Sequence, residues 1–363
     1  MAKAGKKGRI LFLTFGALAI LVAVSGCQEI GFYKQAVAGE YEILAHQKPI
    51  PGLIANPQTP ARVKKKLEQV MKIRSFAAEE LKLPADKSYI KYVDLHRPYV
   101  VWNVNAAPPL SLDPKTWWFP VVGRASYRGY FHEADALHYA ERWKKKGWDI
   151  YVDGISTYST LGWFHDPILN TFLFEPETDL AETIFHELGH RRLFVSGDTD
   201  FNEAYATTVA AEGIRRWFAA ATNAPAYAAY QRDRAHEKDF VNLVMACRDK
   251  LAAVYDDKNL SDSDKLKRKE QIIQGLRDEY AQTKIRWGEP KSGYDYWFAE
   301  PINNAKLNTV SAYYDLAPAF EALLRAQGGD LEKFYRAVGD IGRMPLQQRH
   351  QKLRSYLQTT PAS

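Results

Sequence analysis

The strongest chemical signal in the sequence is a His-Glu-x-x-His motif formed by His186, Glu187 and His190. The surrounding residues have a helical pattern, and four residues advance an α-helix by about 400°, so both histidines project from one face, one turn apart. Glu187 is offset from His186 by about 100° and reaches the same region from the side. The motif therefore predicts two imidazole ligands to one metal ion, with a carboxylate beside its open position.

A third ligand is expected from a second helix. Asn202 and Glu203 follow the motif at the start of a stretch that we expect to be helical to about Ala220. Small residues along this stretch would let the two helices approach closely: Ala204, Ala206, Ala210 and Ala211. Two imidazoles and one carboxylate leave a position of a tetrahedral Zn²⁺ ion free, which is the catalytic rather than the structural arrangement. Glu187 could then take a proton from a water molecule that attacks a carbonyl.

The starts of both helices can also be predicted. Asp179 and Glu182 resemble a capping box for the first helix, and Thr199 or Asp200 can cap the second. The alternative, in which the two histidines are simply exposed polar residues, is weakened by the second helix and its acid. For Glu203 alone, a role as an acid favoured by the helix dipole stays open.

The first thirty residues have the pattern of an export signal. A basic start with no acid precedes the apolar run from Ile10 to Val24, which is too short for a comfortable membrane span. The run ends in Ser-Gly-Cys27, which resembles the lipobox of bacterial lipoproteins, where cleavage precedes the cysteine and its sulfur receives a diacylglyceryl group. Gln28 rather than Asp after the cysteine favours the outer membrane, facing the periplasm. An uncleaved anchor helix is the alternative.

The net charge bears on the kind of binding partner, and the cysteine content bears on the role of Cys247. Most of the net charge of +6 lies in the segment that cleavage before Cys27 would remove, so no nucleic-acid partner is expected. Cys247 is the second of the two cysteines and lies in an apolar helical stretch. We expect it to be a core residue, because no activating base is recognisable near it for a nucleophilic role.

The two metal helices resemble those of the gluzincin metallopeptidases, in which Asn-Glu stands near the start of the second helix. The resemblance implies that His186, His190 and Glu203 are zinc ligands, that Glu187 is the general base and that Asn202 is a structural neighbour.

One position departs from that pattern. Thermolysin-like members have an Asp one turn after the third ligand, which orients the first histidine, whereas this chain has Thr207. Either Thr207 or another acid, such as Asp198 or Glu212, would then orient the histidine.

Most of the chain is also similar to a family of bacterial aminopeptidases described as predicted lipoprotein metallopeptidases. The similar segments, besides the metal motif and the Gly-Cys27 pair, are 31–36, 97–103, 112–117, 119–123, 127–131, 158–164, 197–199 and 303–305. The resemblance implies a metallopeptidase more firmly than it implies amino-terminal specificity.

Further site residues follow from these resemblances. The family places a tyrosine at Tyr313, which is the expected oxyanion donor, with Tyr205 and Tyr314 as rivals. Gluzincins bind substrate along an edge strand, for which Tyr158–Phe164 is the candidate, although an ordinary core strand is an equal alternative. His165 is expected to be a loop residue.

The predicted fold is of the α+β class, gluzincin-like, with a mixed sheet followed by the metal helices and a largely helical C-terminal half. Residues 1–26 form the signal peptide, 27–87 a tether and helical segment, 88–224 the zinc-peptidase core, and 225–363 a helical part packed on that core. Helices are expected near 32–44, from a Thr59 cap with Pro60 in the first turn, and over 133–146. Strands are expected over 99–104, 117–122, 149–153 and 158–164.

The predicted function is zinc-dependent hydrolysis of a peptide substrate by a lipid-anchored envelope protein. A catalytically silent zinc-containing scaffold is one alternative, and an endopeptidase or amidase acting on cell-wall peptides is another. An aminopeptidase needs an acid that binds the substrate's free amine. Glu175, Glu177 and Glu182 are nearby in sequence, and the sequence does not choose among them.

Overall fold

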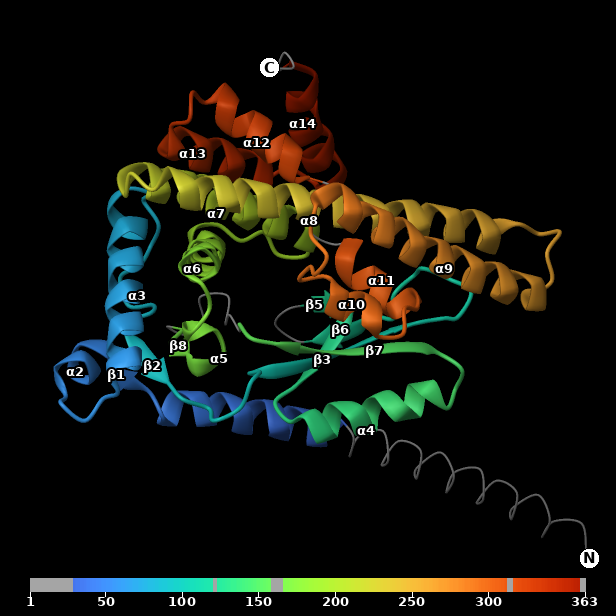
Figure 1. Cartoon of the computed structure of the whole chain (residues 1–363), viewed down its shortest axis with the longest axis horizontal. Helices are drawn as coiled ribbons and strands as arrows, with labels where there is room; N and C mark the ends of the chain where they lie inside the picture. Colours follow the sequence, from blue (N-terminus) through green and yellow to red (C-terminus); the bar gives the residue numbers. More distant parts are fainter. Residues whose placement is uncertain (1–28, 120–122, 158–165, 312–315, 360–363) are drawn as a thin grey trace, which may run out of the picture.

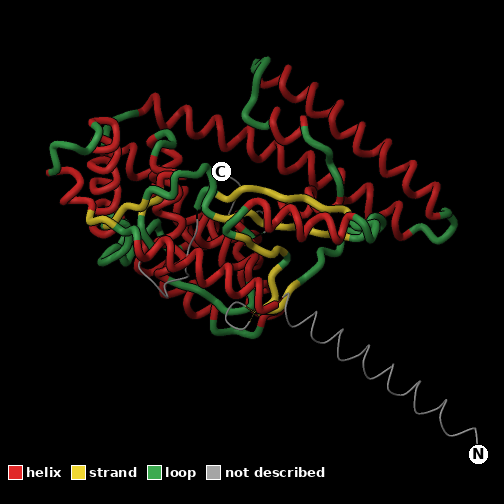
Figure 2. The backbone as a smooth tube through the Cα atoms, turned by 90° about the horizontal axis from the view of Figure 1, so that it is seen from below, coloured by secondary structure: helices red, strands yellow, loops and turns green. Residues whose placement is uncertain are grey.

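The computed structural model describes residues 29–119, 123–157, 166–311 and 316–359 (Figure 1). The fold is mixed α+β, with small sheets in the first half and a largely helical second half, as predicted. The short strands gather in the middle of a mostly helical molecule (Figure 2). Cys27, Tyr313, Tyr314, His165 and the expected edge strand 158–164 lie outside the described residues.

The first half begins with a helix over residues 29–45. The elements that follow are β1 (Lys48–Pro49), α2 (Ile50–Ala55), α3 (Ala61–Glu79), β2 (Lys91–Val93), β3 (Val101–Ala107), β4 (Trp117–Phe119), β5 (Gly123–Ala125), β6 (Tyr127–Tyr130), α4 (Glu133–Lys144), β7 (Asp149–Ile155), β8 (Ile168–Leu169) and α5 (Asn170–Leu173). Pro60 lies at the N-cap of α3 rather than in its first turn, and the expected Thr59 side-chain cap is absent there.

The second half consists of helices. They are α6 (Glu177–Arg192), α7 (Thr199–Ala220), α8 (Ala224–Asp256), α9 (Asp262–Trp287), α10 (Asp295–Ala299), α11 (Asn304–Ser311), α12 (Ala317–Ala326), α13 (Leu331–Gly342) and α14 (Leu346–Thr359). Helices α12 to α14 lie across α7, and α8 pairs with α9 in a long hairpin (Figure 1).

The largest sheet has the strand order β6-β3-β7, and both pairs are antiparallel. Side chains alternate between its faces. Trp102, Val104 and Tyr130 lie on one face, where they pack with Phe32 of the first helix and with α4. The other face is polar, because Asn105 of β3 is paired directly with Tyr127 of β6 on one side and with Tyr151 of β7 on the other. The strand predicted over 99–104 is displaced to Val101–Ala107, because its pairing with β7 continues to the end of that partner.

Close contact between α6 and α7 depends on small residues, as predicted. A Cβ atom added to Gly213 would lie 2.6 Å from the Phe185 ring, and one added to Gly189 would lie 3.4 Å from the Ala206 Cα atom. Such distances leave almost no room for a side chain, so the two helix axes can approach closely enough to share a site.

The predicted caps of α6 and α7 were wrong. Helix α6 begins at Glu177 after Pro176, so Asp179 lies inside the first turn, and no side-chain cap is formed there. The cap of α7 is Asp198 rather than Thr199 or Asp200, and its carboxylate accepts a hydrogen bond from the Phe201 amide at 3.2 Å. The predicted end of α7 at Ala220 is confirmed.

Cys247 lies in the apolar cluster of α8, α9, α10 and α11, where it is 3% exposed. Burial raises the pKa of its thiol to about 11, so the thiol stays protonated and unreactive near neutral pH. Its prediction as a core residue is confirmed. Among the described residues, no helix is long and apolar enough to cross a membrane.

Candidate metal centre

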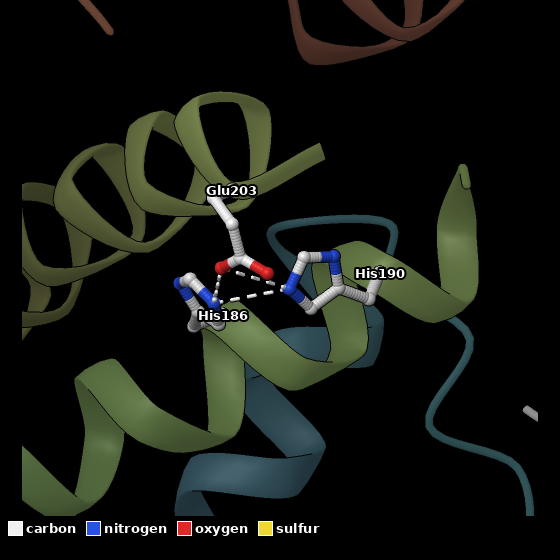
Figure 3. A group of neighbouring side chains, drawn as sticks. All are labelled: His186, His190 and Glu203. Atoms are coloured by element: carbon white, nitrogen blue, oxygen red, sulfur yellow. Dashed lines mark hydrogen bonds and ion pairs between the residues drawn. The ribbon is translucent and has the colours of Figure 1, made fainter. Parts of the chain in front are cut away.

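Three side chains from α6 and α7 converge on one point (Figure 3). The Nε2 atom of His186 lies 3.2 Å from Oε2 of Glu203, and the Nε2 atom of His190 lies 3.5 Å from the same oxygen. The two Nε2 atoms are 3.1 Å apart. The i, i+4 spacing on α6 and the close approach of α7 thus bring the three predicted ligands together.

These distances can be compared with those in a zinc site. Ligand atoms that lie 2.0–2.1 Å from a tetrahedral Zn²⁺ ion are separated from each other by about 3.3 Å. The three separations of 3.1–3.5 Å match this value. Two imidazoles and one carboxylate are also a donor set typical of catalytic zinc. The group can therefore hold a metal ion in its present conformation.

The electrostatic state of the three side chains suits a cation. Burial alone would raise the pKa of Glu203, but hydrogen bonds with His186 and His190 hold it near 2, so the carboxylate is ionised at neutral pH. Burial alone would lower the pKa of His186, but its hydrogen bond to Glu203 and the charge of Glu187 raise it. The excess negative charge around the imidazoles favours any cation, whether a proton or a metal ion.

Glu187 follows the first ligand on α6 and is partly buried. Its Oε2 atom is buried without a hydrogen-bond partner in the described part of the chain. The charge of Glu187 also raises the pKa of the buried Tyr89, after the larger effect of burial, which places this carboxylate within electrostatic reach of that ring. A free carboxylate oxygen beside the ligand cluster is what a general base requires.

Asn202 is a structural residue of the site, as the resemblance implied. It is 2% exposed, its Oδ1 atom accepts a hydrogen bond from the Val195 amide at 2.8 Å, and its Nδ2 atom donates to the Val195 carbonyl at 2.8 Å. Both bonds hold the loop between α6 and α7. Asn202 thereby fixes the start of α7, and with it the position of Glu203.

Two of the acids considered for orienting the histidines have other partners. Asp198 is buried at the start of α7 and contacts Arg349 at 2.5 Å and His350 at 2.9 Å, which ties α14 to α7. Glu212 accepts hydrogen bonds from Arg215 and Arg216. The described residues also leave the Nδ1 atom of His190 buried without a partner.

Two of the three acids considered for binding a substrate amine already have hydrogen-bond partners within the protein. Glu177 accepts a hydrogen bond from the Trp217 indole at 3.0 Å, and Glu182 accepts one from the Tyr230 hydroxyl at 3.0 Å. Burial raises the pKa of Glu175 to about 7. Of the three, Glu182 lies nearest to the metal ligands, since its charge contributes to the raised pKa of His186.

Tyr205, a rival for the oxyanion donor, does not reach the site. Its side chain is fully buried and packs against Phe320 and Phe334, with ring centroids 6.0 and 6.1 Å away. It is therefore a core residue between α7 and the C-terminal helices.

The structure places another tyrosine, which the sequence did not indicate, near the metal ligands. Tyr127 of β6 lies on the polar face of the sheet and is 45% exposed. Burial of its hydroxyl raises its pKa, and the charges of Glu203, Glu187 and Asp153 raise it further. Tyr127 is therefore within electrostatic reach of all three carboxylates, and its side chain is partly exposed to water.

Asp153 of β7 lies on the same face of the sheet. Its Oδ1 atom accepts a hydrogen bond from the Asn105 amide at 2.7 Å, and Asn105 is paired with Tyr127 in the neighbouring strand. Burial raises the pKa of Asp153 to about 6, and the charge of Glu300 adds to this effect. Among the described residues, no Lys or Arg forms an ion pair with it. Asn103 and Asn105 alternate with apolar residues in β3, and this alternation was the sequence signal for a polar face.

Comparison with known proteins agrees with this arrangement. A family model described as "Putative aminopeptidase" matches residues 31–353. The chain belongs to this family. The comparisons found no match among curated proteins or among solved structures.

The family match includes every part of the candidate site. The matched span of residues 31–353 includes both metal helices and the whole β6-β3-β7 sheet. Membership in the family therefore indicates peptide hydrolysis.

Proposed function

We propose that this protein is a zinc-dependent aminopeptidase of the gluzincin type, held at the bacterial envelope by a lipid on Cys27. The observation that supports it most is the convergence of His186, His190 and Glu203 at separations of 3.1–3.5 Å, with a free oxygen of Glu187 beside them. A site that only stabilised the fold would have no need of a second carboxylate with an unpaired oxygen.

The residues of the site have distinct roles in this proposal. His186, His190 and Glu203 would hold Zn²⁺, which when bound would activate water and polarise the substrate carbonyl. Glu187 accepts the proton of the attacking water and delivers it to the nitrogen of the breaking peptide bond, so that the leaving amine departs neutral. Asn202 keeps Glu203 in place through its two hydrogen bonds to Val195.

We assign the hydrogen bond to the developing oxyanion to Tyr127. Its hydroxyl is within electrostatic reach of both Glu203 and Glu187, and the residue is partly exposed on the polar face of the sheet. Tyr127→Phe removes only the hydroxyl, and the ring stays in its strand. We expect kcat to fall about 100- to 1,000-fold, the range seen when one oxyanion donor is lost, with zinc content unchanged. Steady-state kinetics measure kcat, and elemental analysis measures the zinc content. An unchanged kcat would indicate that Tyr313, and not Tyr127, is the oxyanion donor.

We assign recognition of the substrate's free amine to Asp153. This partly buried carboxylate shares the polar face of the sheet with Tyr127 and has no cationic partner among the described residues. An ammonium group of the substrate would supply the missing positive charge. Hydrogen bonds to charged groups contribute about 1.5–3 kcal/mol, which corresponds to about 10- to 100-fold in kcat/KM.

The experiment compares peptides with a free and with an acetylated amino terminus. Wild-type protein loaded with Zn²⁺ should cleave the free peptides at least tenfold faster, and Asp153→Asn should abolish that preference while it retains zinc. Glu182→Gln is the matched control, because Glu182 already has Tyr230 as a partner, and it should keep the preference. Equal cleavage of both peptides by the wild type would indicate an endopeptidase. Zinc binding without any cleavage would favour the scaffold alternative.

The envelope location is part of the same proposal. The Ser-Gly-Cys27 sequence after an apolar run supports cleavage before Cys27 and acylation of its sulfur. Gln28 supports the outer membrane, with the protein facing the periplasm.

A further inference from the structure

The helix over residues 29–45 is apolar on two opposite sides. Its inner side is fixed to the sheet: Phe32 is 8% exposed and lies 5.5 Å from the Tyr130 ring, and Gln35 accepts a hydrogen bond from the Phe131 amide at 2.9 Å. Gly39 fits against the Phe131 ring, where a Cβ atom would lie within 2.4 Å of ring carbons. These contacts fix the orientation of the helix, so its outer side cannot be buried against the protein by rotation about the helix axis.

The outer side carries a continuous row of large apolar residues, which we call the outer stripe. Its members are Ile30 (68% exposed), Tyr33 (39%), Val37 (70%), Tyr41 (71%) and Leu44 (39%). At 100° per residue these five positions lie within an arc of about 80°. Scattered apolar residues on a surface need no explanation, but a straight row along a whole helix indicates a surface that is covered in the cell.

Charges near the outer stripe favour a lipid surface. Glu29 and Glu42, near the two ends of the helix, form ion pairs with Arg128 and Arg97 of the protein, each at 2.9 Å. Their negative charges are therefore compensated. Lys34 is exposed beside the stripe. Helix α4 lies in the same layer below the sheet and ends at the exposed basic segment 144–146 (Figure 1). Such basic residues are attracted to anionic headgroups.

The position of the helix in the chain points to the same occupant. Glu29, which belongs to this helix, is the second residue after Cys27. An extended residue spans at most about 3.6 Å, so a lipid on Cys27 would hold the start of the helix within about 7 Å of the bilayer surface. Tyrosine side chains, which provide two of the five members of the stripe, are favoured at that interface.

We propose that the outer stripe lies in the surface of the bilayer, so that the helix over 29–45 is a second membrane contact beside the lipid anchor. This inference rests on the proposed acylation of Cys27. The diacylglyceryl group would hold the protein at the membrane, and a flat amphipathic helix would add buried apolar area and fix the orientation of the protein. The sheet lies between this helix and the metal helices (Figure 1), so the metal centre faces away from the membrane.

The experiment uses the full lipidated protein in vesicles of phosphatidylethanolamine and phosphatidylglycerol. A nitroxide is attached at Val37→Cys, and the control label is attached at Leu266→Cys, a 42% exposed position on α9. Cys247 is buried, so it should not be labelled. Membrane-soluble oxygen should relax the label at position 37 and a water-soluble nickel complex should not, whereas the control should show the reverse.

Two outcomes would overturn the inference. If position 37 is as accessible to nickel as position 266 while the protein stays on the vesicles, the lipid anchors the protein and the helix does not touch the bilayer. If position 37 is shielded from both reagents, with or without vesicles, a second copy of the chain or another protein covers the stripe. Acylation is tested separately, because Cys27→Ser should abolish incorporation of labelled palmitate whatever the nitroxide reports.

Discussion

Glu187→Gln should leave a folded protein that binds zinc normally and hydrolyses peptides about 100- to 10,000-fold more slowly than the wild type. The size of the loss is that of a positioned general base. Glutamine keeps the shape of the side chain but cannot accept the proton of an attacking water. Since Glu187 contributes no atom to the group of His186, His190 and Glu203, metal binding should not change. Single-turnover rates with a free-amine peptide, together with zinc content by elemental analysis, measure both effects.

His190→Ala is the contrasting variant. His190 is 5% exposed and supplies one of the three converging atoms, so its loss should remove zinc and activity together. Some stability should be lost as well, because a metal that binds only the folded state stabilises that state by mass action. If Glu187→Gln instead retained most of the activity, the base would be another group. If it lost zinc, Glu187 would be a ligand.

The candidate metal centre was the part of the molecule that could best be predicted from the sequence. A His-Glu-x-x-His spacing on one helix fixes the relative positions of His186 and His190 through local geometry alone. The partner helix could be predicted as well, because small residues and Asn202-Glu203 lie close behind in sequence. The structure brings these ligands together, and α7 ends at Ala220 as expected.

The errors concern helix starts and contacts between distant residues. The cap of α7 was assigned one or two residues too late, and the actual cap, Asp198, is also held in place by Arg349 and His350 from α14, which no local pattern could indicate. Tyr127 was overlooked for the same reason. Its place near the metal ligands depends on the pairing of β6 with β3, and no local signal distinguishes it among 21 tyrosines. Only the alternation of Asn103 and Asn105 in β3 could have indicated a polar sheet face.

Glu203→Ala should reduce bound zinc to a small fraction of the wild-type content. The two remaining imidazoles are a poor cage for Zn²⁺, because protein sites of catalytic zinc have three protein ligands. The carboxylate also supplies the only negative charge among the three converging groups, and its pKa near 2 keeps that charge at any pH where the histidines can bind metal. Elemental analysis after dialysis against a weak chelator measures the loss. Full zinc content would place the third ligand elsewhere.

Asn202→Ala is the matched control one position earlier on α7. It removes two hydrogen bonds to the half-buried Val195, whose amide then lacks this partner while its carbonyl still accepts a hydrogen bond from the Asp198 amide at 3.3 Å. The free energy of unfolding should fall by about 1–3 kcal/mol, while zinc binding persists in the folded fraction. Urea titration in the presence of chelator isolates this effect, because no metal then stabilises either protein.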